Sequence, residues 1–384
     1  MNAEAAGTEM DKAVKSDAKT DVVVERRGSA GLITLNRPKA LNALSLPMVR
    51  ALLSTLKTWR DDPAVRVVAI RGTNKVGRPG SPESLFGGFC AGGDIRFFHQ
   101  AALAGDPALD DFFTQEYILN HLIHNYPKPF IAFMDGIVMG GGMGIGQGAR
   151  VRIVTEHTKM AMPETSIGLF PDVGGGYFLS RCPGHVGEYL ALTGDVIGAD
   201  EALGYGLADV RLDAARLPAL WDDLGTRTFG SAAAMDQWIA TELIASSALP
   251  IIATGQIDTY FSLLRVKHII DALEGSEDPW ALKTAATLRK RSPLMLHVTL
   301  EQIRRARAMT LADDLRMERN MVHHCFHLPP GAKSEAIEGI RAFAIDKDYK
   351  PRWMPARIEE VKAAMVAPFF ESPWPENAHP LRGL

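Results

Sequence analysis

Three glycine-containing segments of the chain have the residue types needed to stabilise an anion. They are residues 89–96 (FCAGGDIR), 139–144 (MGGGMG) and 163–176 (PETSIGLFPDVGGG). Glycine has no Cβ, so a ligand can approach the backbone, and an N–H group at the start of a helix points outward. Two such donors could stabilise a carbonyl oxygen that gains charge during acyl transfer. We predict Gly93 and Gly141 as these donors, although each run alone could equally form a tight turn.

These segments resemble the crotonase superfamily, and the match continues beyond them. The run 161–179 is similar to the 3-hydroxyisobutyryl-CoA hydrolases in particular, and the similarity also covers residues 34–44 (TLNRPKALNAL), 345–348 (IDKD) and 350–353 (KPRW). The resemblance extends over about residues 21 to 361. It implies an α/β fold of the crotonase (ClpP-like) type, a spiral of β-β-α units followed by a mostly helical C-terminal region. It also implies acyl-CoA chemistry that needs no metal or redox cofactor.

The resemblance assigns a role to each matching residue. The backbone N–H groups of Gly93 and Gly141 would form an oxyanion hole, and Glu164 and Asp172 would be the working acids. Glu164 would either activate a water as general base or attack the carbonyl to form a mixed anhydride, and both routes stay open. Asp172 would hold the substrate hydroxyl or assist proton transfer. Contacts with the acyl-CoA are implied for Glu116, Asp94, Ile95 and Arg96.

Simpler interpretations of two of these acids stay open. Asp172 could be only the N-cap of a short helix that starts near Gly174, and Glu116 could be an exposed helix charge. Glu164 is close in sequence to the apolar residues Ile167 and Leu169, which indicates partial burial.

One position departs from the pattern of the superfamily's hydratases. Those enzymes carry a second glutamate two positions after the glycine run, where this chain has Gly144. Adding water to a double bond needs proton delivery and water activation shared between two acids, so the glycine favours thioester hydrolysis. The expected substrates are 3-hydroxyisobutyryl-CoA and 3-hydroxypropionyl-CoA, in valine catabolism. The alternatives are an enoyl-CoA hydratase/isomerase and a catalytically inactive acyl-CoA-binding member.

Two further motifs suggest other kinds of binding site. Residues 144–149 fit a loose dinucleotide-binding pattern, but the preceding strand is expected to end near Met134, too early for that motif. A metal site is suggested by His323, His324, Cys325 and His327. Adjacent histidines on a helix point to different faces, however, and the remaining ligands would have to come from elsewhere. We predict no metal site, and we expect Cys90 to pack under its loop.

Charge and cysteine content limit the classes of partner and compartment. The chain has 45 acidic and 42 basic residues, so no strong positive field attracts nucleic acid. Every apolar run is too short to span a membrane. Three scattered cysteines favour free thiols in a reducing compartment, and we expect a cytoplasmic protein. By resemblance we also expect a homo-oligomer.

The elements that must position these segments alternate between strand and helix up to Arg211. Strands are predicted at 21–27, 31–35, 65–70, 130–134 and 151–155, and helices at 45–60, 94–103 and 110–124. Later helices are predicted at 235–246, 256–273, 293–308 and 311–324. We therefore divide the chain into a disordered tail (1–20), a core domain (21–211), a helical region (212–367) and an extended tail (368–384). The first segment has no Arg and no apolar block, so it does not resemble a targeting peptide.

Overall fold

The computed structural model describes residues 20–74, 86–244, 250, 252–327 and 333–384. Its main sheet has the strand order β1-β2-β3-β4-β6-β8, in which β1 is antiparallel to β2 and every other pair is parallel. The strands are β1 (Val22–Arg27), β2 (Ala30–Leu35), β3 (Val67–Gly72), β4 (Phe130–Met134), β6 (Val151–Val154) and β8 (Val210–Arg211). All but β1 and β8 are almost completely buried, which explains why they read as apolar runs.

A second row of pairings runs beside this sheet and gives the spiral. It consists of the short parallel strands β5 (Ile137–Met139) and β7 (Lys159–Ala161), extended by isolated bridges. The bridges are Leu44 with Gly93, Cys90 with Val138, and Met160 with Ile197. Each turn of chain thus adds one strand to the main sheet and one short segment to the second row before a helix follows. This confirms the predicted crotonase-type fold class.

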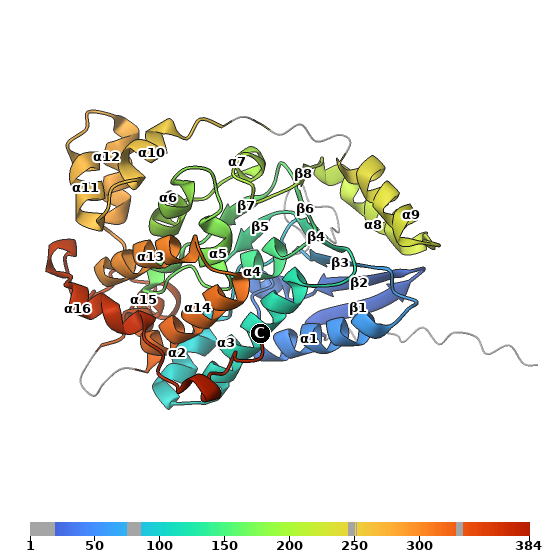
Figure 1. The fold of residues 1–384 in the computed structure, drawn as a ribbon, viewed down its shortest axis with the longest axis horizontal. Helices are drawn as coiled ribbons and strands as arrows, with labels where there is room; N and C mark the ends of the chain where they lie inside the picture. The colour runs from blue at the N-terminus through green and yellow to red at the C-terminus, as the bar shows by residue number, and fades with distance from the viewer. Residues whose placement is uncertain (1–19, 75–85, 245–249, 251, 328–332) are drawn as a thin grey trace, which may run out of the picture.

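Helices cover both faces of the sheet, as Figure 1 shows. One face packs against α1 (Leu46–Asp61) and α3 (Ala108–His124), and the other packs against α8 (Leu217–Thr226) and α9 (Ala232–Trp238). Successive residues of a strand contribute to opposite cores, as expected for a period of two. The remaining helices of the first half are α2 (Ile95–Ala104), α4 (Gly141–Gln147), α5 (Gly175–Leu179), α6 (Val186–Thr193) and α7 (Ala199–Gly204).

The described residues after Arg211 contain no strand, in line with the predicted helical region. The predicted helix over 256–273 is in fact two helices, which meet in a turn with extended backbone at Arg265. No Gly or Pro marks that break, so the spacing of the apolar residues predicted one continuous helix. The helices are α10 (Gly255–Phe261), α11 (Val266–Glu274), α12 (Pro279–Leu288), α13 (Pro293–Ala306), α14 (Leu311–Phe326), α15 (Glu335–Ile340) and α16 (Ala363–Val366).

The two predicted tails have different outcomes. Residues 1–19 lie outside the described part of the chain. The segment 368–384 is not an extended tail, because it folds back onto α14 and buries Phe369 and Leu381. The Arg316 guanidinium of α14 donates to the carbonyl of Leu381 at 3.2 Å. The prolines suggested an extended chain, but the apolar side chains between them provide a surface for packing.

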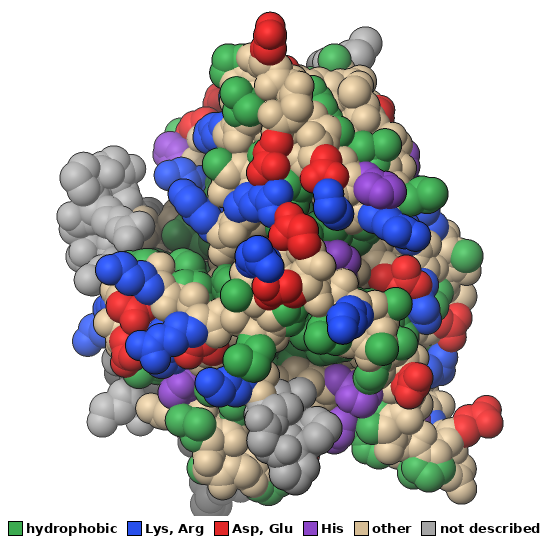
Figure 2. All heavy atoms as spheres, turned by 90° about the vertical axis from the view of Figure 1, so that its left-hand side faces the viewer, with side chains coloured by type: hydrophobic (Ala, Val, Ile, Leu, Met, Phe, Trp, Pro, Cys, Tyr) green, Lys and Arg blue, Asp and Glu red, His purple; other side chains and the backbone are tan. Residues whose placement is uncertain are grey.

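The outer surface carries both signs of charge. On the face shown in Figure 2, Lys and Arg side chains are interspersed with Asp and Glu. Among the described residues, no helix is both long and apolar enough to cross a membrane.

Candidate active site

A cavity of about 320 Å³ lies where the second row of pairings meets the helices. Its walls come from the start of α2, the middle of α3, the start of α4 and the loop after β7, together with one residue of the C-terminal half, Phe343. Six of the predicted site residues line it: Gly93, Ile95, Glu116, Gly141, Glu164 and Asp172. The three segments singled out in the sequence therefore meet at one place.

The two predicted oxyanion donors are close neighbours. Gly141 is the first residue of α4, so its N–H has no partner within the helix. Neither this N–H nor that of Gly93 donates a hydrogen bond to any residue that the structure describes. A Cβ placed on Gly141 would lie 3.4 Å from the Gly93 nitrogen. Two unpaired donors thus border the same small volume, as an oxyanion hole requires.

Side chains at the glycine run would collide with the acids of the cavity. A Cβ on Gly140 would lie 2.7 Å from Glu164 Oε1, and one on Gly141 would lie 2.6 Å from Glu116 Oε1. Gly140 also has a φ of 49°, a left-handed conformation that favours glycine. The glycines therefore let two carboxyl groups approach the backbone at the start of α4.

The acids of the cavity are buried without a cation. Glu116 and Glu164 are 2% and 7% exposed, and Glu116 Oε1 and Glu164 Oε2 have no hydrogen-bond partner. No Lys, Arg or His is found among the described residues that line the cavity. Burial, and next the charge of Asp172, raises the pKa of Glu164 well above its usual value. Burial, Asp172 and Glu164 do the same to the pKa of Glu116, so this acid is not the exposed helix charge that the alternative described.

Asp172 is held by a partner that the sequence analysis missed. The Tyr117 hydroxyl donates to Asp172 Oδ2 at 2.8 Å. Burial raises the pKa of Asp172 to about 6, and this hydrogen bond opposes the shift. The N-cap of α5 is Gly174, so Asp172 is not the simple helix cap that the sequence left open. Nothing in the sequence indicated Tyr117, because its contact with Asp172 spans 55 residues.

The loop that carries Asp172 is fixed by α14, which the sequence analysis also missed. Glu318 is fully buried, and its two carboxylate oxygens accept from the N–H groups of Gly174 at 2.7 Å and Gly176 at 3.0 Å. Directly before them, Val173 has a φ of 58°, which is strained for a β-branched residue. Asn120 of α3 donates to the Val173 carbonyl at 3.1 Å. Asp172 is thus set by contacts from two helices.

Neighbouring atoms fill the space that the hydratases' second glutamate would need at Gly144. A Cβ on Gly144 would lie 2.5 Å from Asn120 Nδ2 and 2.6 Å from the Val173 Cβ. No acid side chain fits there without moving the loop that carries Asp172. Gly144 also lies inside α4 rather than at a strand-to-helix turn, so the dinucleotide motif has the wrong structural context.

The three residues implied to contact acyl-CoA at the start of α2 lie in different surroundings. Ile95 lines the cavity, whereas Asp94 and Arg96 do not. The Asp94 carboxylate accepts from the Phe97 N–H at 3.3 Å and from Arg37 at 2.8 Å, so it caps α2 and forms an ion pair. Arg96 is exposed at the surface. Any role of these two residues in binding the CoA portion stays a prediction.

Cys90 has the packing role that we expected. Its side chain is fully buried, and Sγ lies 3.2 Å from the Asn42 carbonyl. Burial raises the pKa of the thiol to about 12, so the nucleophilic thiolate is absent at neutral pH.

The spiral and the paired N–H groups beside buried acids define the crotonase class of proteins. The chain belongs to the enoyl-CoA hydratase/isomerase family, whose sequence model matches residues 30–370.

Individual relatives are similar over nearly the full chain. A protein of Gallus gallus named 3-hydroxyisobutyryl-CoA hydrolase, mitochondrial, is 37% identical, with 91% of this chain and 89% of that protein covered. Its namesake in Xenopus tropicalis is 39% identical, with 92% and 89% covered. A crystal structure described as a carnitinyl-CoA dehydratase from Mycobacterium thermoresistibile superposes with a TM-score of 0.80 at 37% identity, covering 91% of this chain and 96% of that one. The reactions that these names describe differ, so the residues of the site must discriminate between them.

Proposed function

We propose that this protein hydrolyses the thioester of 3-hydroxyisobutyryl-CoA, and that of 3-hydroxypropionyl-CoA, to the free hydroxy acid and CoA. One observation carries the proposal: Glu164, Asp172 and Glu116 share a small cavity with the unpaired N–H groups of Gly93 and Gly141. The names of the relatives from Gallus gallus and Xenopus tropicalis support the choice of substrate.

The reaction begins when the thioester carbonyl oxygen accepts hydrogen bonds from Gly93 and Gly141. A water oxygen, deprotonated by Glu164, adds to the carbonyl carbon, or a Glu164 oxygen adds directly. The resulting oxyanion collapses, the carbon–sulfur bond breaks, and the CoA thiolate takes up the proton that Glu164 removed from water. In the direct route, water then cleaves the mixed anhydride and supplies the proton that the thiolate takes up. Both routes consume one water and leave Glu164 unchanged. Asp172, held by Tyr117, binds the substrate hydroxyl or passes the proton.

Hydratase or isomerase activity is the second candidate, favoured by the description of the Mycobacterium thermoresistibile structure as a dehydratase. The packing at Gly144 argues against it, because the second acid of the hydratases has no room there. A catalytically inactive acyl-CoA-binding protein is disfavoured for another reason. Burying three acids together is costly, and a protein that only binds its ligand gains nothing from them.

The deciding experiment follows thiol release with a chromogenic thiol reagent. We expect release from 3-hydroxyisobutyryl-CoA and 3-hydroxypropionyl-CoA, and none from crotonyl-CoA. Glu164→Gln should slow release by roughly 10²- to 10⁴-fold, the usual contribution of a general base. Glu376→Gln, at an exposed acid far along the chain, is the matched control and should keep full activity. Hydration of crotonyl-CoA without thiol release from either hydroxyacyl thioester would replace the hydrolase proposal with the hydratase one.

The setting of the enzyme is also part of the proposal. We place it in valine catabolism, as a cytoplasmic homo-oligomer that uses no cofactor beyond the CoA of its substrate. The buried free thiols of Cys90, Cys182 and Cys325 support a reducing compartment. The Gallus gallus relative is named mitochondrial, so cell fractionation must decide between the cytoplasm and the mitochondrion. Light scattering on the purified chain tests the oligomeric state.

A further inference from the structure

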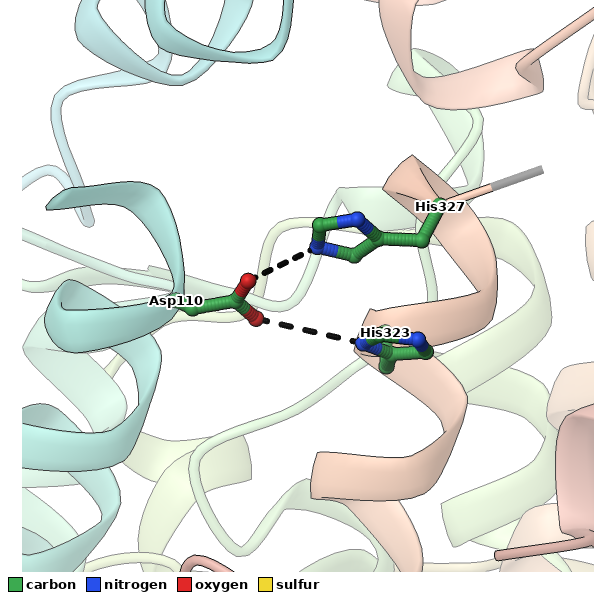
Figure 3. A group of neighbouring side chains, drawn as sticks. All are labelled: Asp110, His323 and His327. Carbon is green, nitrogen blue, oxygen red and sulfur yellow. Dashed lines mark ion pairs between the residues drawn. The ribbon is translucent and has the colours of Figure 1, made fainter. Parts of the chain in front are cut away.

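A second cluster of side chains with metal-binding chemistry lies outside the cavity, where α3 meets α14. Asp110 is in the first turn of α3, and His323 and His327 are four residues apart near the end of α14. Figure 3 shows the Asp110 carboxylate between the two helices, facing both imidazole rings. One ligand atom from each residue lies within 4.8 Å of the other two. From the sequence, any ligand beyond the histidines had to come from another part of the chain. Asp110 of α3 provides it.

The contacts within the cluster leave one nitrogen unsatisfied. His327 Nε2 lies 2.8 Å from Asp110 Oδ2, whereas His323 Nδ1 lies 4.0 Å from Asp110 Oδ1. His323 Nδ1 is buried and has no hydrogen-bond partner. A simple ion pair between Asp110 and His327 therefore explains only half of the arrangement. A cation bound between the three residues would use the lone pair of His323 Nδ1 and remove the cost of burying it unpaired.

The donor set indicates a transition-metal ion. Two imidazole nitrogens and one carboxylate oxygen form a set that zinc takes in proteins, with three protein ligands and the fourth position left to water. Asp110 and His327 have side chains that are 36% and 45% exposed, so solvent can reach that position. We propose that Asp110, His323 and His327 form a zinc-binding site that joins α3 to α14.

Arg319 sets both the geometry and the strength of this site. Its guanidinium donates to Asp110 Oδ1 at 2.6 Å, which orients the carboxylate and leaves Oδ2 toward His327. Such outer contacts commonly fix a metal ligand in place. The same positive charge repels a cation, so we expect weaker binding than at a site of the same ligands without an arginine.

The position of the site connects it to the acids of the cavity. α3 also carries Glu116 and Tyr117, and α14 carries Glu318, which holds the Asp172 loop. A bound ion would therefore cross-link the two helices that position those acids. The zinc site does not depend on the hydrolase proposal, because its ligands lie outside the cavity.

The test titrates chelator-treated full-length protein with Zn²⁺ in competition with a chromogenic zinc indicator. We expect one ion per chain and a higher melting temperature with Zn²⁺. His323→Ala and His327→Ala should each weaken binding at least about tenfold, because each removes one of three ligands. His324→Ala is the matched control: this ring lies on another face, where Nε2 is 3.1 Å from the Glu371 carbonyl. It should leave the affinity unchanged.

A spectroscopic measurement distinguishes the loss of a metal ligand from unfolding of the variant. Co²⁺ in place of Zn²⁺ should give the intense visible absorption of a low-coordinate nitrogen and oxygen site, and His327→Ala, at the exposed end of α14, should lose it while keeping the wild-type circular dichroism. Absence of stoichiometric binding by the wild type, or equal affinity in the His323→Ala/His327→Ala double variant, would overturn the proposal.

Discussion

At the scale of single residues, the pKa values of the cavity acids are raised by different causes. Burial alone raises the pKa of Asp172, to about 6. Glu164 feels burial and then the charge of Asp172, and Glu116 feels burial and both other acids. Because burial and two neighbouring acids all raise its pKa, Glu116 favours its protonated form, which can donate a hydrogen bond.

These causes predict how two conservative variants change the pH profile. In the proposed mechanism Glu164 acts in its ionised form, so kcat/KM should rise with pH as it loses its proton. Asp172→Asn removes the charge that raises the pKa of Glu164, and the acid limb should move to lower pH. Glu116→Gln leaves both causes of the raised Glu164 pKa, burial and Asp172, in place, and should leave the limb where it is. Residual thiol release across the pH range measures both; equal shifts in the two variants would contradict this difference.

The sequence was informative where function depends on short motifs. Gly93, Gly141 and Glu164 lie in local segments whose residue types indicate their chemistry, and the structure brings them together. Tyr117 and Glu318 were missed because each acts through a contact with a distant segment, 55 and 144 residues away. Spacing along one helix carries no information about such partners. The packing at Gly144 was equally invisible, since it depends on Asn120 and Val173.

At the scale of elements, α14 acts as the support of the Asp172 loop. Its Glu318 carboxylate accepts from the N–H groups of Gly174 and Gly176 and from Gln302 Nε2 at 3.1 Å. Glu318→Gln leaves one oxygen for these donors and sets an NH₂ group against an N–H group. We expect the loop to shift and kcat to fall about tenfold or more, with a smaller change in KM. A structural defect alone would lower the active fraction without moving the pH limb, whereas a displaced Asp172 should move it.

A neighbouring acid provides the control for this variant. Asp314 accepts from the Tyr177 N–H at 2.8 Å through one oxygen, and Asp314→Asn keeps that acceptor. We expect near wild-type kcat for Asp314→Asn, and the same loss in both variants would refute a specific role for Glu318.

Element boundaries show where pattern reading works and where it fails. Buried strands gave continuous apolar runs: β4 has the predicted bounds, and β3 begins and ends two residues later than predicted. β5 was missed because three residues are too few to show a period. The break between α10 and α11 was missed because no Gly or Pro marks it. In the final segment, burial of Phe369 and Leu381 against α14 outweighed the extended preference of the prolines.

At the scale of the whole molecule, the two halves form one core. Buried residues of α13 and α14 belong to the same hydrophobic cluster as one face of the sheet. The cavity reflects this union, because Phe343, in the π-helical turn Arg341–Ile345, completes a wall built by the first half. The sequence located the change to a helical region near Arg211 but did not single out Phe343, whose place in the wall depends on contacts between residues far apart in the chain.

The closure predicts that Phe343 limits the length of the acyl group, given the proposed hydrolase activity. Phe343→Ala enlarges the cavity beside Ile95 and Leu169, so longer 3-hydroxyacyl thioesters should gain kcat/KM relative to 3-hydroxyisobutyryl-CoA. One methylene in an apolar pocket changes selectivity by roughly 10- to 200-fold, which sets the expected scale. Phe370→Ala is the matched control, because that ring packs under Arg305 and does not line the cavity. Thiol release from a series of chain lengths measures the ratio. An unchanged ratio in Phe343→Ala would mean that the first half alone sets the acyl preference.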